Sequence, residues 1–328
     1  MPIRVIIDTD PGVDDALALL LGLLSPELQV EAITTVCGNV SVDMATRNVF
    51  RVLSLLAEKP WPPVARGADR PLKNELKTAA AVHGEDGLGN LERYQLPDSS
   101  PRYPDPEILP APQGAIPLLF NLLDRFPGEI SLIALGPLTN LAQAILRDPG
   151  RMQQVGEIIL MGGAIGVPGN VTPVAEFNIY TDPEAAQIVF RSGLPLTVVP
   201  LDVTRQVRLT RKAILEEIQP LGTRIGQFIV DSTAYSLELF ERIEEIPAIT
   251  LHDPLAVGVA VDPSLLNLKP LFVDVEIQGE MTRGMTVADL RPIAADLKAK
   301  PNARVARTVD GKRFLNLFRE RLCPESSS

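Results

Sequence analysis

The sequence predicts an α/β protein with an open, mainly parallel, doubly wound sheet and helices on both faces. Apolar runs of strand length alternate with longer helical patterns through most of the 328 residues, as in strand–helix–strand units. Several predicted strands are apolar throughout, as expected for strands covered on both faces. Hydrophobic residues make up 45% of the chain and charged residues 22%, which is typical of a globular domain.

Most of the predicted elements lie in the first two thirds of the chain. Strands are expected where short apolar runs are bounded by polar or turn residues, at Arg4–Asp8, Val30–Val36, Ile130–Leu135, Glu157–Met161 and Leu196–Leu201. Helices are expected where apolar residues recur at helical spacing, at Val13–Ser25, Val42–Glu58, Ala115–Arg125, Leu138–Arg147 and Pro183–Ser192. Alternation of this kind implies right-handed crossovers between parallel strands.

The last third of the chain has a different order of elements. After Leu209 the pattern becomes helical through Arg242. Two further strands and a final helix are then expected, at Leu271–Ile277, Ala303–Val309 and Lys312–Leu322.

The domain organisation follows from the proline distribution. Six prolines between Pro97 and Pro112 predict a long extended loop, and the same α/β pattern lies on both sides of it. We therefore expect one domain over residues 1–323 and a short flexible tail over residues 324–328.

Charge and cysteine content limit the partners and the compartment. A net charge of −10 argues against nucleic acid and anionic membranes, since both select basic surfaces. Cys37 and Cys323 lie far apart and in no metal-binding spacing, which suits a reducing cytoplasm. No secretory signal precedes the first strand, and the longest apolar run, Ala16–Leu24, is shorter than the roughly 20 residues of a membrane span. We expect a soluble cytoplasmic protein.

Four carboxylates gather where the first strand meets the first helix: Asp8, Asp10, Asp14 and Asp15. Ligand sites in parallel sheets form at the carboxyl ends of the strands. A helix N-terminus favours negative charge by roughly 0.3–1 kcal/mol, which accounts for one or two of these aspartates but not for four. Crowded carboxylates raise one another's pKa unless a cation compensates, and hard oxygen ligands favour Ca²⁺ or Mg²⁺. The structural alternative is a capped helix after a tight turn.

A phosphatase is one alternative for this cluster. The sequence DTD at 8–10 also resembles haloacid-dehalogenase-type phosphatases, in which the first aspartate is a nucleophile and the next but one an acid/base. Those enzymes need a later lysine and an acidic GD-type motif for magnesium. No GDxxxD-like element is found, and Asp14 and Asp15 have no role in that scheme. This alternative is therefore the less favoured one.

Five stretches, in order along residues 5–262, carry a more specific resemblance. They read DTDPGVDDALAL at 8–19, VHGEDGLG at 82–89, GPLTNLA at 136–142, MGGAIGVPGNVTPVAEFNIYTDPEAA at 161–186 and HDPLAV at 252–257. Together they resemble the nucleoside hydrolases, calcium-dependent N-ribohydrolases of the inosine–uridine-preferring type. The resemblance implies hydrolysis of the bond between a nucleobase and C1′ of ribose, through an oxocarbenium-like transition state.

The resemblance also implies a calcium site and the catalytic groups. The Ca²⁺ ligands carried over are Asp10, Asp15, the carbonyl of Leu135, and Asp253. Three carboxylates around a 2+ ion leave a net charge of about −1, which suits a cationic transition state. Asp10 is expected to act as general base on a calcium-bound water, with inversion at C1′, and His252 to protonate or hydrogen-bond the departing base.

Substrate contacts follow from the same resemblance. Ribose hydroxyls are expected to meet carboxylate and amide side chains, from Asp14, Asn39, Asn170, Glu176, Asn178 and Asp253. Met161 is expected under the sugar ring, and His83 on the loop that faces the base. If residues 176–178 are extended, Glu176 and Asn178 point the same way and Phe177 packs on the other side. Taken alone, the glycines and asparagine of the 161–170 segment also fit an ordinary tight loop.

Base preference and loop closure are less well defined. The helix expected at 228–243 carries Phe228, Tyr235 and Phe240, and Phe240 cannot donate a proton to the base. The only tryptophan is Trp61, so a tryptophan sandwich around a purine is not expected. We therefore expect a pyrimidine or broad inosine–uridine preference. The polar segment 69–90 is expected to close over the site and exclude water.

The second functional hypothesis is a nucleoside- or ribose-binding protein of the same fold without turnover. Asp10 argues against it, because a binding protein gains nothing from a general base. The expected partner is a small ribonucleoside, with no nucleic acid and no membrane, and relatives of this kind are commonly homodimers or homotetramers.

Overall fold

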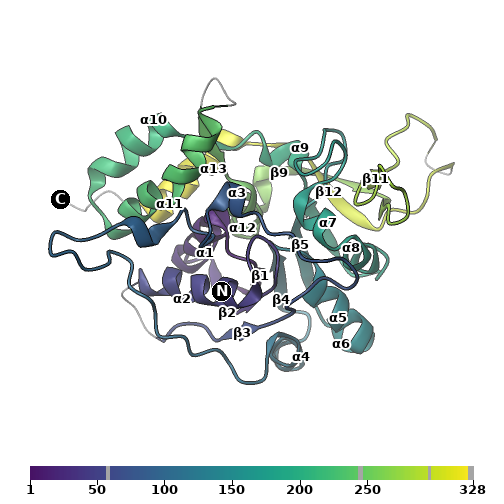
Figure 1. Cartoon of the computed structure of the whole chain (residues 1–328). Helices are drawn as coiled ribbons and strands as arrows, with labels where there is room; N and C mark the ends of the chain where they lie inside the picture. Colours follow the sequence, from purple (N-terminus) through teal and green to yellow (C-terminus); the bar gives the residue numbers. More distant parts are fainter. Residues whose placement is uncertain (57–59, 243–246, 295–296, 324–328) are drawn as a thin grey trace.

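The computed structural model describes residues 1–56, 60–242, 247–294 and 297–323. Within these ranges a main sheet of eight strands runs in the order β3-β2-β1-β4-β5-β6-β12-β9 (Figure 1). Its strands are β1 Ile3–Thr9, β2 Leu28–Thr35, β3 Val64–Arg66, β4 Ile130–Ala134, β5 Glu157–Met161, β6 Leu196–Val199, β9 Leu266–Leu271 and β12 Ala303–Val309. Every pairing is parallel except that of β9 with β12. The predicted fold class is confirmed.

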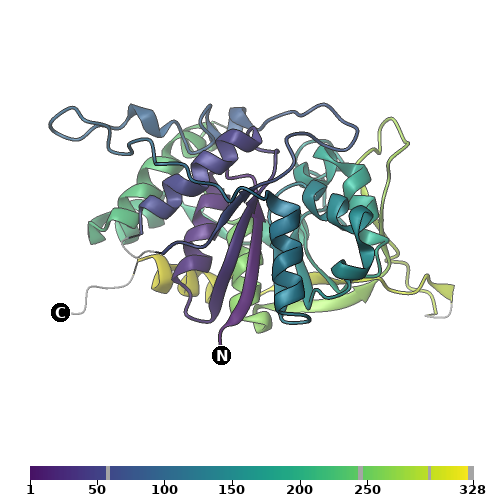
Figure 2. The ribbon, with the colours of Figure 1, turned by 90° about the horizontal axis from the view of Figure 1, so that it is seen from below.

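Two helical layers cover the sheet (Figures 1 and 2). One layer contains α1 Val13–Leu24, α2 Val42–Ser54, α11 Arg224–Phe240, α12 His252–Val261 and α13 Gly311–Leu322. The other contains α4 Ala115–Arg125, α5 Thr139–Arg147, α6 Pro149–Met152 and α8 Pro183–Phe190. Side chains of β1 alternate between the layers, because Val5 and Ile7 join one core and Ile6 joins the other.

Shorter elements complete the described chain. The short helices are α3 Ala80–His83, α7 Phe177–Thr181, α9 Leu201–Thr204 and α10 Arg211–Ala213. A π-helical turn covers Ile214–Ile218, and 3₁₀ turns cover Leu91–Arg93, Gln219–Leu221 and Pro263–Leu265. Two small antiparallel sheets pair β7 Arg208–Thr210 with β8 Ala248–Thr250, and β10 Val273–Val275 with β11 Thr286–Ala288.

Two predictions about elements are corrected by the structure, and the edge strand β3 was not predicted. The strand expected at 271–277 is the short β10, outside the main sheet, and the strand beside β12 is β9. The edge strand β3 is only three residues long, too short for an apolar pattern to reveal. The region from 209 to 242 is helical only in part, since β7 crosses its start. The predicted ends of two helices, at 57–58 and 243, and the tail 324–328 lie outside the described residues.

The sheet brings distant segments together at the carboxyl ends of its strands. In register, Asp8 lies beside Ala134 of β4, Ala134 beside Leu160 of β5, and Met161 beside Val199 of β6. The carboxyl ends of β1, β4, β5 and β6 therefore lie together at one end of the strands, the usual place for a ligand site in an open parallel sheet. The segment between β3 and α4 passes over this end of the sheet, opposite the N-terminus (Figure 2). Among the described helices, none has the length and apolar character to cross a membrane.

Candidate active site

The turn between β1 and α1 is organised by Asp15. One oxygen of its carboxylate accepts hydrogen bonds from the Thr9 hydroxyl at 2.6 Å and the Asp10 amide at 3.3 Å. The other accepts from the amide of Gly12, which caps α1, at 3.0 Å, and from the Asn39 side chain at 3.0 Å. These bonds form an N-terminal capping interaction. The alternative explanation of the aspartate cluster, a capped helix after a tight turn, is therefore correct for Asp15.

Asp10 is held differently. Its Oδ2 accepts a 2.5 Å hydrogen bond from the Asn39 amide, whereas its buried Oδ1 has no partner among the described residues. Glycines flank this carboxylate because nothing larger fits: a Cβ at Gly38 would lie 2.0 Å from Oδ2, and one at Gly136 would lie 2.4 Å from Oδ1. A buried carboxylate oxygen without a donor is costly, and a cation or a water molecule is what such an oxygen binds.

Asp14, Asp15 and Asp253 converge although the chain separates the first two from the third by more than two hundred residues. One carboxylate oxygen from each lies within 4.8 Å of the others, and all three residues are buried. Asp253 stands in the first turn of α12, which packs directly against α1. The convergence therefore follows from the packing of two apolar helices with acidic N-terminal turns.

The electrostatics of this group suit a bound cation. Burial, and next the charge of Asp15, raise the pKa of Asp14 to about 8. The same two causes raise the pKa of Asp10 and of Asp253 well above the ordinary value. Oxygen-only donors at one buried point match the preference of Ca²⁺ or Mg²⁺, and such an ion would let these carboxyls ionise at neutral pH.

Leu135 follows β4, Met161 ends β5, and Asn178 of α7 lies against both. The Asn178 amide donates to the Leu135 carbonyl at 2.6 Å and to the Met161 carbonyl at 3.2 Å. The same amide lies 3.6 Å from the Met161 sulfur. Asn178, the predicted ribose contact, therefore contacts both Leu135, the predicted main-chain ligand, and Met161, the residue predicted under the sugar ring.

The segment 176–178 is extended only at Glu176, because α7 begins at Phe177, and this corrects the expectation of a fully extended segment. Glu176 caps α7, because its carboxylate accepts from the amides of Asn178 at 2.9 Å and Ile179 at 3.2 Å. It also accepts from the Gly163 amide at 3.0 Å. Phe177 is half-buried as the first residue of this helix. The capping function of Glu176 was not predicted, although an acidic residue before a short helix is its usual signal.

Asn170 is the most open of the predicted residues. Its side-chain oxygen accepts from the Phe177 amide at 2.9 Å, and the residue lies in an exposed loop. Arg205 holds that loop by donating to the carbonyls of Pro168 and Gly169 at 2.8 and 2.7 Å. The alternative that this segment is an ordinary loop is therefore correct for its backbone. The Asn170 side chain joins the loop to α7.

The two histidines are both close to the aspartate cluster. His83, the last residue of α3, accepts a 3.1 Å hydrogen bond at Nδ1 from the Val13 amide. His252 Nδ1 lies 2.7 Å from the Thr204 hydroxyl, a contact that the sequence did not predict. Burial is the main cause that lowers the pKa of His83 to about 4 and that of His252 to about 3. Both imidazoles are therefore neutral at pH 7.

The residues considered for base binding differ in position. Phe228 is buried in the core against Tyr103, with ring centroids 5.8 Å apart, whereas Tyr235 and Phe240 are only partly buried. Trp61 precedes β3, so it lies near the amino-terminal ends of the parallel strands, whereas the aspartate cluster lies at their carboxyl ends. Phe228 and Trp61 are therefore parts of the packed structure.

Comparison with known protein families gives one match over most of the chain. The model described as inosine-uridine preferring nucleoside hydrolase matches residues 5–316. Among curated proteins, a relative from Salmonella schwarzengrund (strain CVM19633), the pyrimidine-specific ribonucleoside hydrolase RihA, is 39% identical over 324 residues. That alignment covers 98% of this chain and 99% of the relative.

Solved structures give the same result. A plant nucleoside hydrolase, the PpNRh1 enzyme, is 39% identical with a TM-score of 0.86, covering 98% of this chain and 99% of that one. A purine-preferring ribonucleoside hydrolase from Gardnerella vaginalis is 35% identical with a TM-score of 0.87, covering 97% and 98%.

Proposed function

The chain belongs to the family of inosine-uridine preferring nucleoside hydrolases and is a ribonucleoside hydrolase, and on that premise we propose a calcium-dependent mechanism with Asp10 as general base. The observation that carries the proposal is the convergence of Asp14, Asp15 and Asp253, with which the Asp10 carboxylate interacts electrostatically and whose neighbourhood leaves Asp10 Oδ1 without a partner among the described residues. The proposed ligands are Asp10, Asp15, the Leu135 carbonyl and Asp253.

The ion and the carboxylates have different roles in this mechanism. Calcium, when bound, supplies a positive charge that binds ribose hydroxyls and acidifies the attacking water. The Asp10 carboxylate, whose Oδ1 has no partner among the described residues, would help hold the ion and would accept a proton from the attacking water. Asp14 faces the same buried point and accepts from a sugar hydroxyl.

The ribose contacts are proposed for residues that already carry internal hydrogen bonds. The Asn39 side chain donates to the Asp15 carboxylate, whereas Glu176 and Asn178 use part of their hydrogen-bonding capacity to hold backbone groups around the site. Their remaining lone pairs and donors are available to sugar hydroxyls. Met161 packs at the end of β5 beside Asn178, where its polarizable sulfur faces developing positive charge.

The two histidines act as neutral hydrogen-bond donors in this proposal. His252 would donate a ring N–H to the departing base, and burial keeps its pKa at about 3 in the absence of substrate. His83 would face the base from beside residues 8–15, here called the aspartate turn. Its Nδ1 accepts from the Val13 amide, which leaves Nε2 for the base. Asn170 would contact a ribose hydroxyl from its exposed loop.

We propose a preference for pyrimidine nucleosides. Curated relatives at 38–40% identity are named pyrimidine-specific, while one structural relative at 35% identity is named purine-preferring. If the partly buried Tyr235 and Phe240 face the base, α11 offers it one hydroxyl and no indole. The protein is further proposed to act in the cytoplasm in nucleoside salvage, as a homodimer or homotetramer; sedimentation velocity would test the assembly.

Release of free base and ribose tests the mechanism. The protein, stripped with a chelator, is incubated with uridine, cytidine and inosine before and after calcium is restored. We expect activity to depend on calcium, to be highest with the pyrimidines, and to fall by about 10³-fold or more in Asp10→Asn. The matched control is Asp43→Asn, an exposed aspartate paired with Arg66. Full activity in Asp10→Asn would remove Asp10 as the base.

The same assay addresses the alternatives. A binding protein without turnover would bind uridine in calorimetry and release no base. A phosphatase would hydrolyse a generic phosphate ester with magnesium and leave nucleosides intact.

A further inference from the structure

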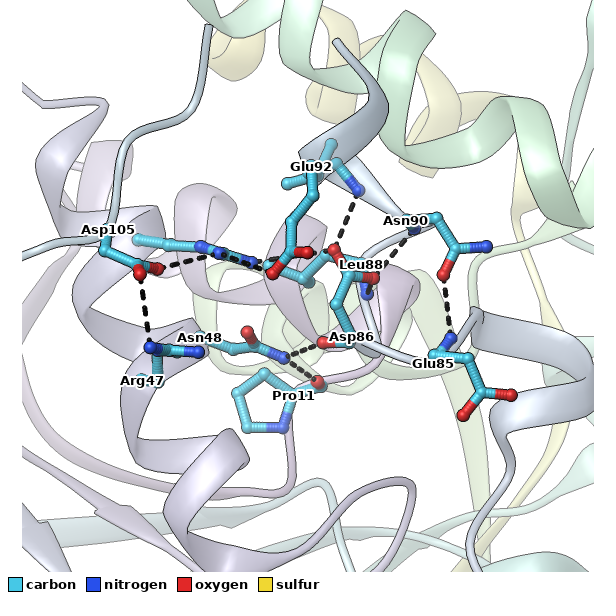
Figure 3. Close-up of polar contacts among 11 residues, drawn as sticks. Pro11, Arg47, Asn48, Glu85, Asp86, Leu88, Asn90, Glu92 and Asp105 are labelled. Atoms are coloured by element: carbon cyan, nitrogen blue, oxygen red, sulfur yellow. Dashed lines mark hydrogen bonds and ion pairs between the residues drawn. The ribbon is translucent and has the colours of Figure 1, made fainter. Parts of the chain in front are cut away.

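Two segments of the site that are far apart in sequence are joined by one buried side chain. Asn48, in the middle of α2, donates both protons of its amide nitrogen to backbone carbonyls (Figure 3). One carbonyl belongs to Pro11 in the aspartate turn, at 3.1 Å, and the other to Asp86 in the loop after α3, at 2.8 Å. Its Oδ1 has no partner among the described residues, so the amide nitrogen is the part that faces the two loops.

The Asp86 carboxylate organises the loop that Asn48 holds. One oxygen accepts from the amides of Leu88 at 2.9 Å and Asn90 at 2.7 Å, and the other accepts from the Leu91 amide at 2.7 Å (Figure 3). Three amides on one carboxylate fix the turn, as a side-chain cap fixes the start of a helix. The loop is therefore built around a single buried negative charge.

Arg51 balances that charge from the same helix as Asn48. Its Nη1 lies 3.5 Å from Asp86 Oδ2, and the two side chains are only 4% and 7% exposed. Arg51 also contacts Asp105 at 3.0 Å and Glu92 at 3.8 Å (Figure 3). Removing either member of a buried pair leaves an uncompensated charge, so Arg51 and Asp86 depend on each other.

Glycines let the loop approach its neighbours. Gly87 and Gly89 have φ of +77° and +80°, where a side chain is strained. A Cβ at Gly87 would lie 2.7 Å from Val40 and 3.0 Å from the Asn48 amide, and one at Gly89 would lie 2.2 Å from the Ser232 carbonyl. The loop is thus packed tightly between α2 and α11.

His83 is the residue that this arrangement positions. Its carbonyl accepts from the Gly89 amide at 2.8 Å, which ties it to the Asp86 loop. Its ring accepts at Nδ1 from the Val13 amide at 3.1 Å, which ties it to the aspartate turn. With Nδ1 as acceptor, the neutral ring carries its proton on Nε2.

We propose that Asn48, Asp86 and Arg51 are positioning residues that keep His83 and the aspartate turn in one fixed relation. This inference rests on the proposed function, in which both segments contact the nucleoside. Asn48 links the two segments directly, while Asp86 and Arg51 hold one of them rigid. Outer hydrogen-bond partners of this kind change metal affinity or activity by about 10–100-fold.

The test uses the isosteric variant Asn48→Asp, which replaces both donors by an acceptor facing two carbonyls. We expect kcat/KM for uridine to fall about tenfold or more at a temperature well below the melting transition, and calcium affinity to weaken in calorimetry. Asp86→Asn, which keeps the size of the side chain, is the second variant in case Asn48→Asp does not fold. Arg47→Ala is the matched control: it neighbours Asn48 on α2, and its Asp105 ion pair is exposed. It should stay within twofold of the wild type.

A readout independent of activity separates positioning from general stability. Histidine-selective ¹⁵N labelling gives signals from only two histidines, which His83→Asn assigns. In the wild type His83 should give one set of signals with Nδ1 unprotonated. In Asn48→Asp and Asp86→Asn these signals should shift or split. Unchanged His83 signals and kinetic constants within twofold, in folded variants, would overturn the proposal. An inactive wild type with the expected signals would overturn the proposed function alone.

Discussion

Asp8 is a buried carboxylate whose two oxygens have different surroundings. Its Oδ1 accepts from the Asn140 amide at 2.7 Å and the Thr34 hydroxyl at 2.5 Å, and its Oδ2 has no partner among the described residues. Burial raises the pKa of Asp8 from 3.8 to about 6, and the two hydrogen bonds only partly oppose it. It is the one aspartate of the DTDPGVDD run with no proposed place in the mechanism.

Asp8 should therefore make stability fall as pH rises. The folded state binds the Asp8 proton more tightly than the unfolded state, so this contribution is fully present below pH 3.8 and is lost as pH rises through about 6. The difference corresponds to roughly 3 kcal/mol. In calcium-free buffer, urea unfolding between pH 4 and 7.5 should show Asp8→Asn gaining by about this amount relative to wild type. A difference between the two proteins that does not change with pH would contradict it.

Gly136 sets the space available to Asp10. A Cβ there would lie 2.4 Å from Asp10 Oδ1 and 2.9 Å from Val36, so Gly136→Ala must displace the proposed base. Displacements of about 1 Å can cost about 10²-fold in rate, and we expect a loss of that order in kcat/KM for uridine. Gly150→Ala is the control, since its nearest neighbour would lie at 3.4 Å. Equal activity of the two variants would mean that the Asp10 carboxylate tolerates displacement.

At the scale of elements, the segment 69–90 is anchored at several points. The Leu72 amide donates to Asp182 at 2.8 Å, the Asn74 side chain donates to the Thr181 carbonyl at 3.1 Å, and the Ala79 amide donates to the Asn39 carbonyl at 2.9 Å. Within the described ranges, no hydrogen bond holds the amides of residues 75–78. The closure predicted for the whole segment is therefore expected to involve mainly these four residues.

Hydrogen exchange tests this division. Amides of Leu88, Asn90 and Leu91 are bound to Asp86 and should exchange slowly without nucleoside. Amides of residues 75–78 should exchange rapidly and become protected when a nucleoside analogue binds. Rapid exchange throughout 83–91 in the free protein would show that the whole segment moves.

The elements that could be predicted from the sequence are those with strong local signals. The buried strands β1, β4, β5 and β6 are nearly continuous apolar runs, so their positions could be predicted from the local hydrophobic pattern. The edge strand β9 contains Pro270 and a polar alternation, so its membership of the sheet depends on pairing with β12. The turn at Glu176 was misjudged because its carboxylate accepts backbone amides, including that of Gly163, which is distant in sequence.

At the scale of the whole molecule, the candidate site exists because the strand order brings distant segments together. Motif spacing alone could not show that Asp253 lies within 4.8 Å of Asp14 and Asp15, which depends on α1 packing on α12. The resemblance supplied these residues as a set before any geometry was available. The supporting contacts of Thr204 and Asn48 could not be predicted, because each depends on where a neighbouring helix lies.

Calcium should stabilise the whole fold through this convergence. Without a cation the folded protein carries crowded carboxyls whose pKa is raised: Asp14 to about 8, and Asp10 and Asp253 well above the ordinary value. Calcium at 100 times its dissociation constant would add about 2.7 kcal/mol of stability and release protons on binding. The melting temperature should therefore rise with calcium, and more at pH 8 than at pH 6.

Asp253→Asn should abolish most of that rise, whereas Asp262→Asn, at an exposed ion pair with Arg313, should retain it. The reason is that Asp253 alone carries the contribution of α12 to a site whose other carboxylates stand before or on α1. Differential scanning calorimetry with calcium and with chelator measures both effects. An equal calcium response in the two variants would mean that α12 takes no part in binding, and the convergence of the three aspartates would then be a feature of packing alone.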